Sequence, residues 1–156
     1  MSNTYSQLYV HCVFAPKYRS ALLLPHFDER LRQYITAIIQ RRGHKMLAIN
    51  NVEDHLHLLF GWAPKESLSS IMEAVKGDSS KWINTQDFLP RKFNWQSGYG
   101  AFSHSRSQID GVVKYIMNQQ EHHKRETFLE EYRRVLTNNG VEFDEQYLFR
   151  EPCEDD

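Results

Sequence analysis

The chain has 156 residues, of which 40% are hydrophobic and 25% charged, with a net charge of −1; this composition excludes a disordered protein and is typical of a soluble globular one. No apolar run approaches the ~20 residues that a membrane-spanning helix needs, and the N-terminus lacks the basic and apolar regions of a secretion signal. The two cysteines, Cys12 and Cys153, are too few for a disulfide framework or a four-cysteine zinc site. We therefore expect a single domain over residues 1–156 in a reducing, cytoplasmic location.

Charge is distributed unevenly along the chain. Residues 1–125 hold 16 Lys and Arg against 10 Asp and Glu, a balance of +6, whereas residues 126–156 hold 3 against 10, a balance of −7. The segment at about 140–156 is an expected acidic tail. The asymmetry permits a basic binding face for nucleic acid, and it fits equally well a solvated tail with no such face.

The first half of the chain predicts a strand, a helix and two strands. Residues 7–15 are rich in β-branched and aromatic side chains, which favours a strand. Residues 28–42 place apolar side chains at helical spacing, with Asp28 as the expected N-cap. Residues 45–52 and 54–61 predict two strands with room for little more than a tight turn between them.

The next elements are a helix and a fourth strand. Residues 68–84 predict a helix that the side chain of Ser67 caps. Residues 85–98 contain proline and glycine and are expected to be irregular. Residues 98–105 predict a strand whose glycine-containing start is loosened.

Two helices follow, over residues 107–124 and 126–138. The first six elements run strand, helix, strand, strand, helix, strand, which is the order of the ferredoxin-like split β-α-β arrangement. The predicted fold class is therefore α+β, with an antiparallel sheet and additional C-terminal helices. Helices on one face of such a sheet would leave the other face free for a site or a dimer contact.

The third predicted strand carries two histidines. Because side chains alternate across a strand, His55 and His57 share one face, while the core face consists of Leu56, Leu58 and Phe60. Two neutral imidazoles at this spacing can be ligands of one cation, or they can lie on an exposed face without a ligand. Histidine-triad nucleotide hydrolases need a third alternating histidine, and position 59 is leucine. A metal site would need a further ligand from elsewhere in the chain.

The helix over residues 107–124 offers candidates for the rest of a site. Tyr115 and Gln119 are four residues apart and share one helical face, which His122 continues while His123 lies to the side. By itself, Tyr115 fits a half-buried residue with its hydroxyl in water. Beside a cation that polarises a phosphate, the same hydroxyl can attack a phosphodiester and form a phosphotyrosine.

These motifs resemble those of a known family. "VEDHLHLLF" is similar to the His-hydrophobic-His motif of the HUH single-strand nucleases, and "KYIMNQQEHHK" is similar to their single-tyrosine helix. With "YVHCVFAPKYR" near the start, "GYGAFSHS" before the helix and "GVEFDEQYLF" near the end, the chain resembles the IS200/IS605-type single-tyrosine (Y1) transposases over nearly its whole length.

The resemblance implies a ferredoxin-like homodimer in which the tyrosine helix of one subunit can complete the histidine pair of the other. Its substrate would be single-stranded DNA at insertion-sequence ends, recognised beside hairpins and cleaved to a 5′-phosphotyrosine and a free 3′-hydroxyl. Tyr115 would be the nucleophile, and His55, His57 and Gln119 would bind Mg²⁺ or Mn²⁺, of which Mn²⁺ suits nitrogen ligands better. His122 would be an alternative metal ligand or a phosphate contact. A cytoplasmic, nucleoid-associated protein with no membrane partner and no small-molecule cofactor is expected.

Basic residues elsewhere are candidates for DNA contacts, although each is by default a solvated charge. They are Lys17, Arg19, Arg41, Arg42, Arg91, Lys92 and Arg106. Two alternatives to the transposase stay open. One is a domesticated relative that binds or processes chromosomal hairpins or palindromic repeats, and the other is a hairpin-binding module without catalysis.

Overall fold

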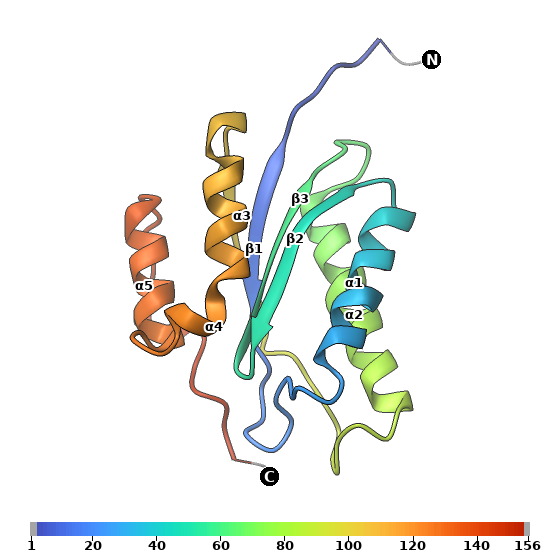
Figure 1. The fold of residues 1–156 in the computed structure, drawn as a ribbon, viewed down its shortest axis with the longest axis vertical. Coiled ribbons are helices and arrows are strands. Elements are labelled where there is room, and N and C mark those ends of the chain that lie inside the picture. The colour runs from blue at the N-terminus through green and yellow to red at the C-terminus, as the bar shows by residue number, and fades with distance from the viewer. Residues whose placement is uncertain (1–2, 155–156) are drawn as a thin grey trace.

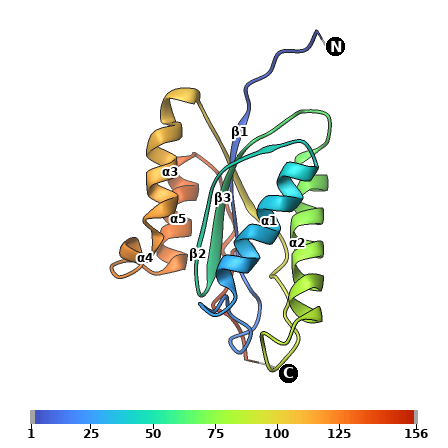
Figure 2. The ribbon, with the colours of Figure 1, turned by 45° about the vertical axis from the view of Figure 1, so that its right-hand side comes forward.

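The computed structural model describes residues 3–154, which form one four-stranded sheet between two groups of helices (Figure 1, Figure 2). The strands are β1 (Tyr9–Phe14), β2 (Lys45–Val52), β3 (His55–Gly61) and β4 (Gly100–His104). All neighbours pair antiparallel, in the order β2-β3-β1-β4, which two interleaved β-α-β units produce. The predicted ferredoxin-like α+β fold is confirmed.

The helices lie on both sides of the sheet. α1 (Asp28–Arg41) and α2 (Leu68–Thr85) cover one face, while α3 (Ile109–Met117), α4 (Gln119–His122) and α5 (Phe128–Asn138) lie on the other side (Figure 1). Two short 3-10 turns precede α3 and follow α5, at Arg106–Gln108 and Glu145–Tyr147. Within residues 3–154, no helix combines the length and the apolar character that a membrane span requires.

Strand alternation divides the apolar side chains of β3 between the two faces. Leu58 and Phe60 are fully buried in the main core, to which α1 and α2 also contribute. Leu59 points to the opposite face and packs with Ile109 and Ile116 of α3 in a second, smaller cluster. The sheet therefore has a packed layer on each side.

The expectation of a free sheet face is wrong. α3, α4 and α5 cover the face that carries His55 and His57, and these two histidines are 0% and 1% exposed. The cause is apolar burial, because Ile109 and Ile116 leave water by packing on Leu59. The histidine pair lies in a buried site between β3 and the C-terminal helices.

The start of α1 also differs from the prediction. Its N-cap is Phe27, and no side chain caps the helix. Asp28 lies in the first turn instead, where its carboxylate meets Arg32 at 3.3 Å and accepts a hydrogen bond from Asn51 at 3.3 Å. The carboxylate is therefore engaged by other side chains. In α2 the prediction is confirmed, because the side chain of Ser67 accepts a hydrogen bond from the first turn.

The helix predicted over residues 107–124 is broken at Asn118, where the chain leaves α3 and turns into α4 (Figure 1). Tertiary hydrogen bonds explain the break. Asn50 Nδ2 on β2 donates to the Ile116 carbonyl oxygen at 2.9 Å, and Gln120 Nε2 donates to Asn50 Oδ1 at 3.0 Å. These bonds tie the end of α3 and the start of α4 to the sheet.

The acidic segment predicted at about 140–156 lies against the rest of the chain as far as residue 154. Arg133 on α5 pairs with Glu145 at 2.9 Å, and Arg19 pairs with Glu154 at 3.2 Å. Residues 155–156, which belong to the same predicted tail, lie outside the described residues.

A cluster of polar contacts on Glu66 joins the end of α1 to the start of α2. The Glu66 carboxylate accepts hydrogen bonds from Arg42 Nε at 3.1 Å, His44 Nε2 at 2.8 Å and Ser70 Oγ at 3.1 Å. His44 Nδ1 accepts from the backbone N–H of Ala63 at 3.0 Å, which leaves Nε2 as the donor to Glu66. The bonds from Arg42 and His44 lower the pKa of Glu66 to about 2.

We predict that Glu66→Gln lowers the free energy of unfolding by roughly 1–2 kcal/mol at pH 7, because the cluster loses its negative charge. The folded pKa of Glu66 lies below the ordinary value of 4.5, so the carboxylate stabilises fully above that value and loses its contribution as the pH falls toward 2. Urea unfolding at pH 7 and at roughly pH 2 measures the difference. Glu73→Gln, on an exposed position of α2, is the control. An equal difference at both pH values would contradict the ionic explanation.

Candidate active site

The two histidines of β3 are oriented by the atoms behind them. His55 Nδ1 lies 2.7 Å from the Asp54 carboxylate, which accepts the hydrogen bond, so Nδ1 carries the proton. His57 Nδ1 lies 2.7 Å from His11 Nε2 on the neighbouring strand β1. When Nδ1 of each ring donates, both Nε2 atoms present lone pairs to the same region. They face Oε1 of Glu131 on α5, at 3.2 Å from His55 and 3.0 Å from His57.

α3 and α4 place a tyrosine and a glutamine beside this pair within one chain. The Tyr115 ring stands edge-on to the His57 ring, with the ring centroids 5.9 Å apart. Gln119 is fully buried, and its Oε1 lies 3.1 Å from His55 Nε2. Although the helix breaks at Asn118, Gln119 Nε2 still lies 3.5 Å from the Tyr115 carbonyl oxygen. The structure thus brings together the four residues that the sequence suggests as nucleophile and ligands.

The centre of the cluster is a buried carboxylate absent from the predicted site, Glu131, which is 1% exposed. Its Oε1 also lies 3.1 Å from His123 Nε2, while its Oε2 accepts hydrogen bonds from Gln119 Nε2 at 3.1 Å and from the Tyr115 hydroxyl. The sequence holds a signal for it, because Glu131 interrupts the apolar face of α5. That face otherwise consists of Phe128, Tyr132, Val135 and Leu136. A carboxylate on such a face predicts a buried polar contact.

Another residue absent from the predicted site is His11, which is 4% exposed and contacts His57 from β1. The signal for it is its position in an otherwise apolar strand. Side chains of β1 alternate, so His11 faces the same side as Val13, which is paired with His57 in the sheet register. His11 therefore belongs to the same polar layer as the β3 pair.

The first turn of α5 is anchored against the site. Thr127 caps the helix by accepting a hydrogen bond from the Glu130 backbone at 3.2 Å. The Phe128 ring stacks on the His55 ring, with centroids 4.1 Å apart and planes at 10°. Phe128 also lies in the main core. These contacts fix Glu131 between β3 and α3.

The donor set of this cluster fits a divalent cation. His123 Nδ1 donates to the Glu126 carbonyl oxygen at 2.7 Å, so a neutral His123 has only a lone pair on Nε2, and that buried atom has no hydrogen-bond partner. Nε2 of a neutral His55 likewise faces oxygen acceptors. Ligand atoms of His55, His57 and Glu131 lie within 4.8 Å of one another. A cation would satisfy lone pairs that otherwise face each other without a proton.

Burial and the shared carboxylate separate the pKa values of the cluster. Burial lowers the pKa of His57 to about 4. Burial also opposes protonation of His55, but hydrogen bonds to two carboxylates outweigh it and raise its pKa. Burial disfavours the charge on Glu131 too, yet the three neighbouring imidazoles of His123, His55 and His57 hold its pKa far below the ordinary value. Burial and then the Glu131 charge raise the pKa of Tyr115, so the phenol keeps its proton at neutral pH.

Arg134 and His122 contact Tyr115 and also line a surface cavity. Arg134 Nη2 donates to the Tyr115 hydroxyl at 3.2 Å, and the His122 ring centroid lies 5.4 Å from that of the tyrosine. Both side chains are held by Glu126, whose carboxylate lies 3.0 Å from Arg134 Nε and 2.6 Å from His122 Nε2. The cavity has a volume of about 660 Å³. Tyr115 itself does not line the cavity, and Arg134 and His122 connect it to the tyrosine.

Three of the predicted DNA-contact residues lie around the loop that follows β1. Lys17 Nζ and the Arg91 guanidinium lie 5.3 Å and 4.4 Å from the centre of the Tyr18 ring. Arg19, next in the chain, pairs with Glu154. Lys17 and Arg91 therefore each place a positive charge beside the Tyr18 ring.

The other predicted DNA-contact residues are dispersed. The Arg42 guanidinium is committed to Glu66. Arg106 donates to the Tyr9 hydroxyl on β1 at 3.4 Å. Arg41 and Lys92 are exposed.

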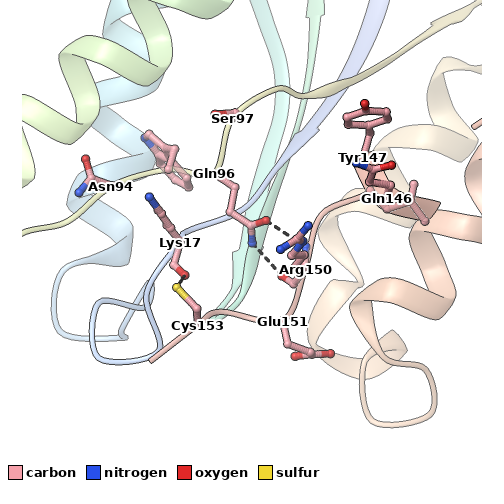
Figure 3. A pocket seen from close by; sticks show the side chains of 11 residues that line it. Lys17, Asn94, Gln96, Ser97, Gln146, Tyr147, Arg150, Glu151 and Cys153 are labelled. Carbon is pink, nitrogen blue, oxygen red and sulfur yellow. Dashed lines mark hydrogen bonds between the residues drawn. The ribbon is translucent and has the colours of Figure 1, made fainter. Parts of the chain in front are cut away.

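The C-terminal segment forms a second cavity, of about 560 Å³, whose lining shares no residue with the cluster around Glu131 (Figure 3). Gln96 Nε2 donates to the Arg150 carbonyl oxygen at 2.8 Å, and the Arg150 backbone N–H donates to Gln96 Oε1 at 3.0 Å, as the dashed lines show. The Cys153 N–H donates to the Lys17 carbonyl oxygen at 2.9 Å. These bonds attach Arg150 to Gln96 and Cys153 to the loop after β1.

A ferredoxin-like sheet that carries a candidate metal cluster beside a tyrosine fits phosphoryl-transfer chemistry. A family model described as "Transposase IS200 like" matches residues 4–119, most of the chain. The chain belongs to the IS200-like transposase family. The matched range includes β3, Tyr115 and Gln119, and it ends before α5 and Glu131.

Two relatives match about three quarters of the chain. The ISDra2 transposase TnpA of Deinococcus radiodurans is 23% identical over 120 residues, covering 74% of this chain and 86% of that protein. The transposase for insertion sequence element IS200 of Salmonella typhimurium is 28% identical over 120 residues, covering 73% and 78%.

Two solved structures share the fold. A crystal structure of a protein from Deinococcus radiodurans R1, described as a transposase, gives a TM-score of 0.59 at 23% identity and covers 76% of this chain and 95% of that one. A REP-associated tyrosine transposase bound to a REP hairpin gives a TM-score of 0.59 at 16% identity and covers 79% and 73%. At these identities the likeness establishes the fold.

We predict that Asn50→Ala loosens α3 and α4 without unfolding the sheet. It removes the bonds to the Ile116 carbonyl and to Gln120 from a buried position, at a cost of roughly 1–3 kcal/mol. Amide hydrogen exchange should become faster over residues 109–122, while β1 and β3 keep their protection. Asn118→Ala, on an exposed residue whose side chain caps no helix, is the control. Unchanged exchange over residues 109–122 would show that Asn50 does not tether these helices.

Proposed function

We propose that the protein is a metal-dependent transposase that cleaves and rejoins single-stranded DNA at insertion-sequence ends through attack by Tyr115. The observation that carries the proposal is that Tyr115, His55 and His57 meet at one buried carboxylate, Glu131, within one chain. A phenol is a weak nucleophile at neutral pH, so it needs a neighbouring positive charge that polarises the phosphate. A tyrosine beside a candidate metal cluster supplies that arrangement.

In the proposed reaction, the Tyr115 oxygen forms a bond to the phosphorus of a phosphodiester while the bond from phosphorus to the 3′-oxygen breaks. The tyrosine loses its proton and the departing 3′-oxygen gains one, so charge and protons balance. The products are a 5′-phosphotyrosine and a free 3′-hydroxyl. Attack by a different 3′-hydroxyl reverses the step, joins the new strand and restores the tyrosine. Because one phosphoester replaces another, the exchange needs no nucleotide energy.

The residues around Tyr115 supply position and charge. Glu131 accepts the hydrogen bond of the tyrosine hydroxyl and so directs its oxygen lone pairs. Arg134, 3.2 Å from that oxygen, brings a positive charge to the place where a phosphate would bind. His55 and His57, with Gln119, would hold a divalent cation, proposed to be Mg²⁺ or Mn²⁺, which when bound polarises the phosphate.

The proposed partner is single-stranded DNA with hairpin ends. A structure with the same fold, the REP-associated tyrosine transposase, is bound to a REP hairpin. The cavity lined by His122 and Arg134 would receive the phosphate to be cleaved, with His122 as a phosphate contact. Lys17 and Arg91 would contact the DNA backbone farther along. The second candidate function is a domesticated role at chromosomal hairpins, which the REP-associated tyrosine transposase favours. The two candidates differ in the DNA that is bound, and the proposed reaction is the same.

Tyr115→Phe is expected to abolish the covalent adduct with DNA, because it removes the attacking oxygen and little else. The full-length protein is incubated with single-stranded DNA that carries an element end, with Mn²⁺ or Mg²⁺. Adducts are measured on a denaturing gel, where the variant should fall to background.

The matched control is Tyr147→Phe, a tyrosine that is 79% exposed in a 3-10 turn and should react like the wild type. Adducts formed equally by the wild type and by Tyr115→Phe would refute the assignment of the nucleophile. If the wild type binds hairpins but cleaves none of several cognate ends, the transposase proposal is refuted and the hairpin-binding module without catalysis is supported.

The site is proposed to assemble in cis, because Tyr115 lies against His57 of the same chain. A homodimer, which the family resemblance implies, is compatible with this arrangement. Mixing Tyr115→Phe chains with His57→Ala chains should therefore give no adduct, since neither chain holds a complete site. Recovery of adduct in the mixture, against none in either variant alone, would instead show that the tyrosine helix is exchanged between subunits.

A further inference from the structure

We infer that Glu131 of α5 is a ligand of the divalent cation at the His55–His57 pair, and that its second oxygen holds the nucleophile. The inference rests on the proposed function and deepens it. It concerns a residue outside residues 4–119, the range that the IS200-like family model matches. The predicted ligand set of His55, His57 and Gln119 would then be extended by an anionic ligand from a different helix.

The first observation is the spacing of the atoms around Oε1 of Glu131. This oxygen lies 3.2 Å from His55 Nε2, 3.0 Å from His57 Nε2 and 3.1 Å from His123 Nε2. Atoms that bind one small divalent ion at about 2.1 Å with right angles between them lie roughly 3 Å apart. The carboxylate oxygen therefore has the spacing of a co-ligand to His55 and His57, and the ligand atoms of these three residues lie within 4.8 Å of one another, whereas His123 groups with His122 and Glu131.

The second observation concerns the hydrogen bonds that hold the far side of two imidazole rings. The Nδ1 protons of His55 and His123 are already donated, to the Asp54 carboxylate and to the Glu126 carbonyl oxygen. In their neutral forms, both rings therefore turn a lone pair toward Glu131, and Nε2 of His123 is buried with no hydrogen-bond partner. A cation bound by His55 Nε2, His57 Nε2 and Glu131 Oε1, which lie within 4.8 Å of one another, would satisfy the lone pair of a neutral His55.

The third observation is that the two carboxylate oxygens of Glu131 contact different groups. While Oε1 faces the imidazoles, Oε2 accepts hydrogen bonds from the Tyr115 hydroxyl and from Gln119 Nε2, the latter at 3.1 Å. The second bond turns the amide so that Gln119 Oε1 points to His55. One carboxylate would thereby hold the nucleophile near a bound cation and orient the Gln119 amide toward it.

Charge and ligand type agree with this assignment. Two imidazoles and an amide form a neutral set rich in nitrogen, which favours ions softer than Mg²⁺. A carboxylate adds a hard oxygen and one negative charge, so the extended set suits Mg²⁺ as well as Mn²⁺.

The test is binding of Mn²⁺ to the full-length protein without DNA, measured by isothermal titration calorimetry. Glu131→Gln keeps the size of the side chain and removes the charge, and it is expected to weaken Mn²⁺ affinity by roughly 10- to 100-fold. Glu130→Gln, an exposed neighbour on the same helix, should bind Mn²⁺ like the wild type. Equal affinity in Glu131→Gln and the wild type, even with a lowered melting temperature, overturns the inference and leaves a structural role.

This readout separates the inference from the proposed function. Tyr115→Phe should keep wild-type Mn²⁺ affinity while it forms no DNA adduct. If Glu131→Gln binds Mn²⁺ normally and the wild type forms the adduct, the ligand assignment fails and the proposed function stands. If Mn²⁺ binding depends on Glu131 but the wild type forms no adduct with cognate DNA, the proposed function fails and the ligand assignment stands.

A second measurement avoids any dependence on the folding of the variant. Crystals of the wild type soaked in Mn²⁺ should give an anomalous peak bounded by His55, His57 and Glu131. A peak held by the histidines and Gln119, with Glu131 turned away from it, overturns the inference.

Discussion

The arrangement of the C-terminal half depends on one buried carboxylate, that of Glu131. A charge removed from water is costly unless it is paired, and here three imidazoles, an amide and a phenol surround it. These partners come from β3, α3, α4 and the chain after α4, so one group connects the sheet to every C-terminal helix. Taking it away would leave polar atoms unpaired on each of these elements at once, which makes the site and the docking of α5 parts of the same interaction.

Strand alternation lets β3 serve this site without weakening the core. Leu58 and Phe60 fill the main core on one face, while His55 and His57 occupy the other. The polar face is enclosed because Leu59 packs against α3, so apolar burial and the polar cluster share one surface of the sheet. Exclusion of water around the histidines follows from this packing, and it strengthens the electrostatic interactions among them.

The sequence predicts the features whose causes are local. The alternation of β3, the cap at Ser67 and the element order each follow from neighbouring residues, and the structure agrees with them. The features that it does not predict have tertiary causes. The break at Asn118 depends on Asn50, which is distant in sequence, and the covered sheet face depends on how α3 packs. The candidate site divides in the same way, because its histidine pair and tyrosine belong to recognisable motifs while Glu131 does not.

A further physical reason explains why the sequence does not identify Glu131 as a site residue. Residues 126–156 have a net charge of −7, and a glutamate in such an acidic segment is by default expected to be a solvated charge. Its helical position distinguishes it, since the neighbouring Glu130 is exposed whereas Glu131 follows Phe128 on the buried face. Because Phe128 stacks on His55 while Glu131 contacts the same ring from the next turn, α5 fixes both the orientation and the electrostatic environment of a β3 histidine. The segment beyond residue 119 is therefore structurally part of the site, even though the match to the family model ends before it.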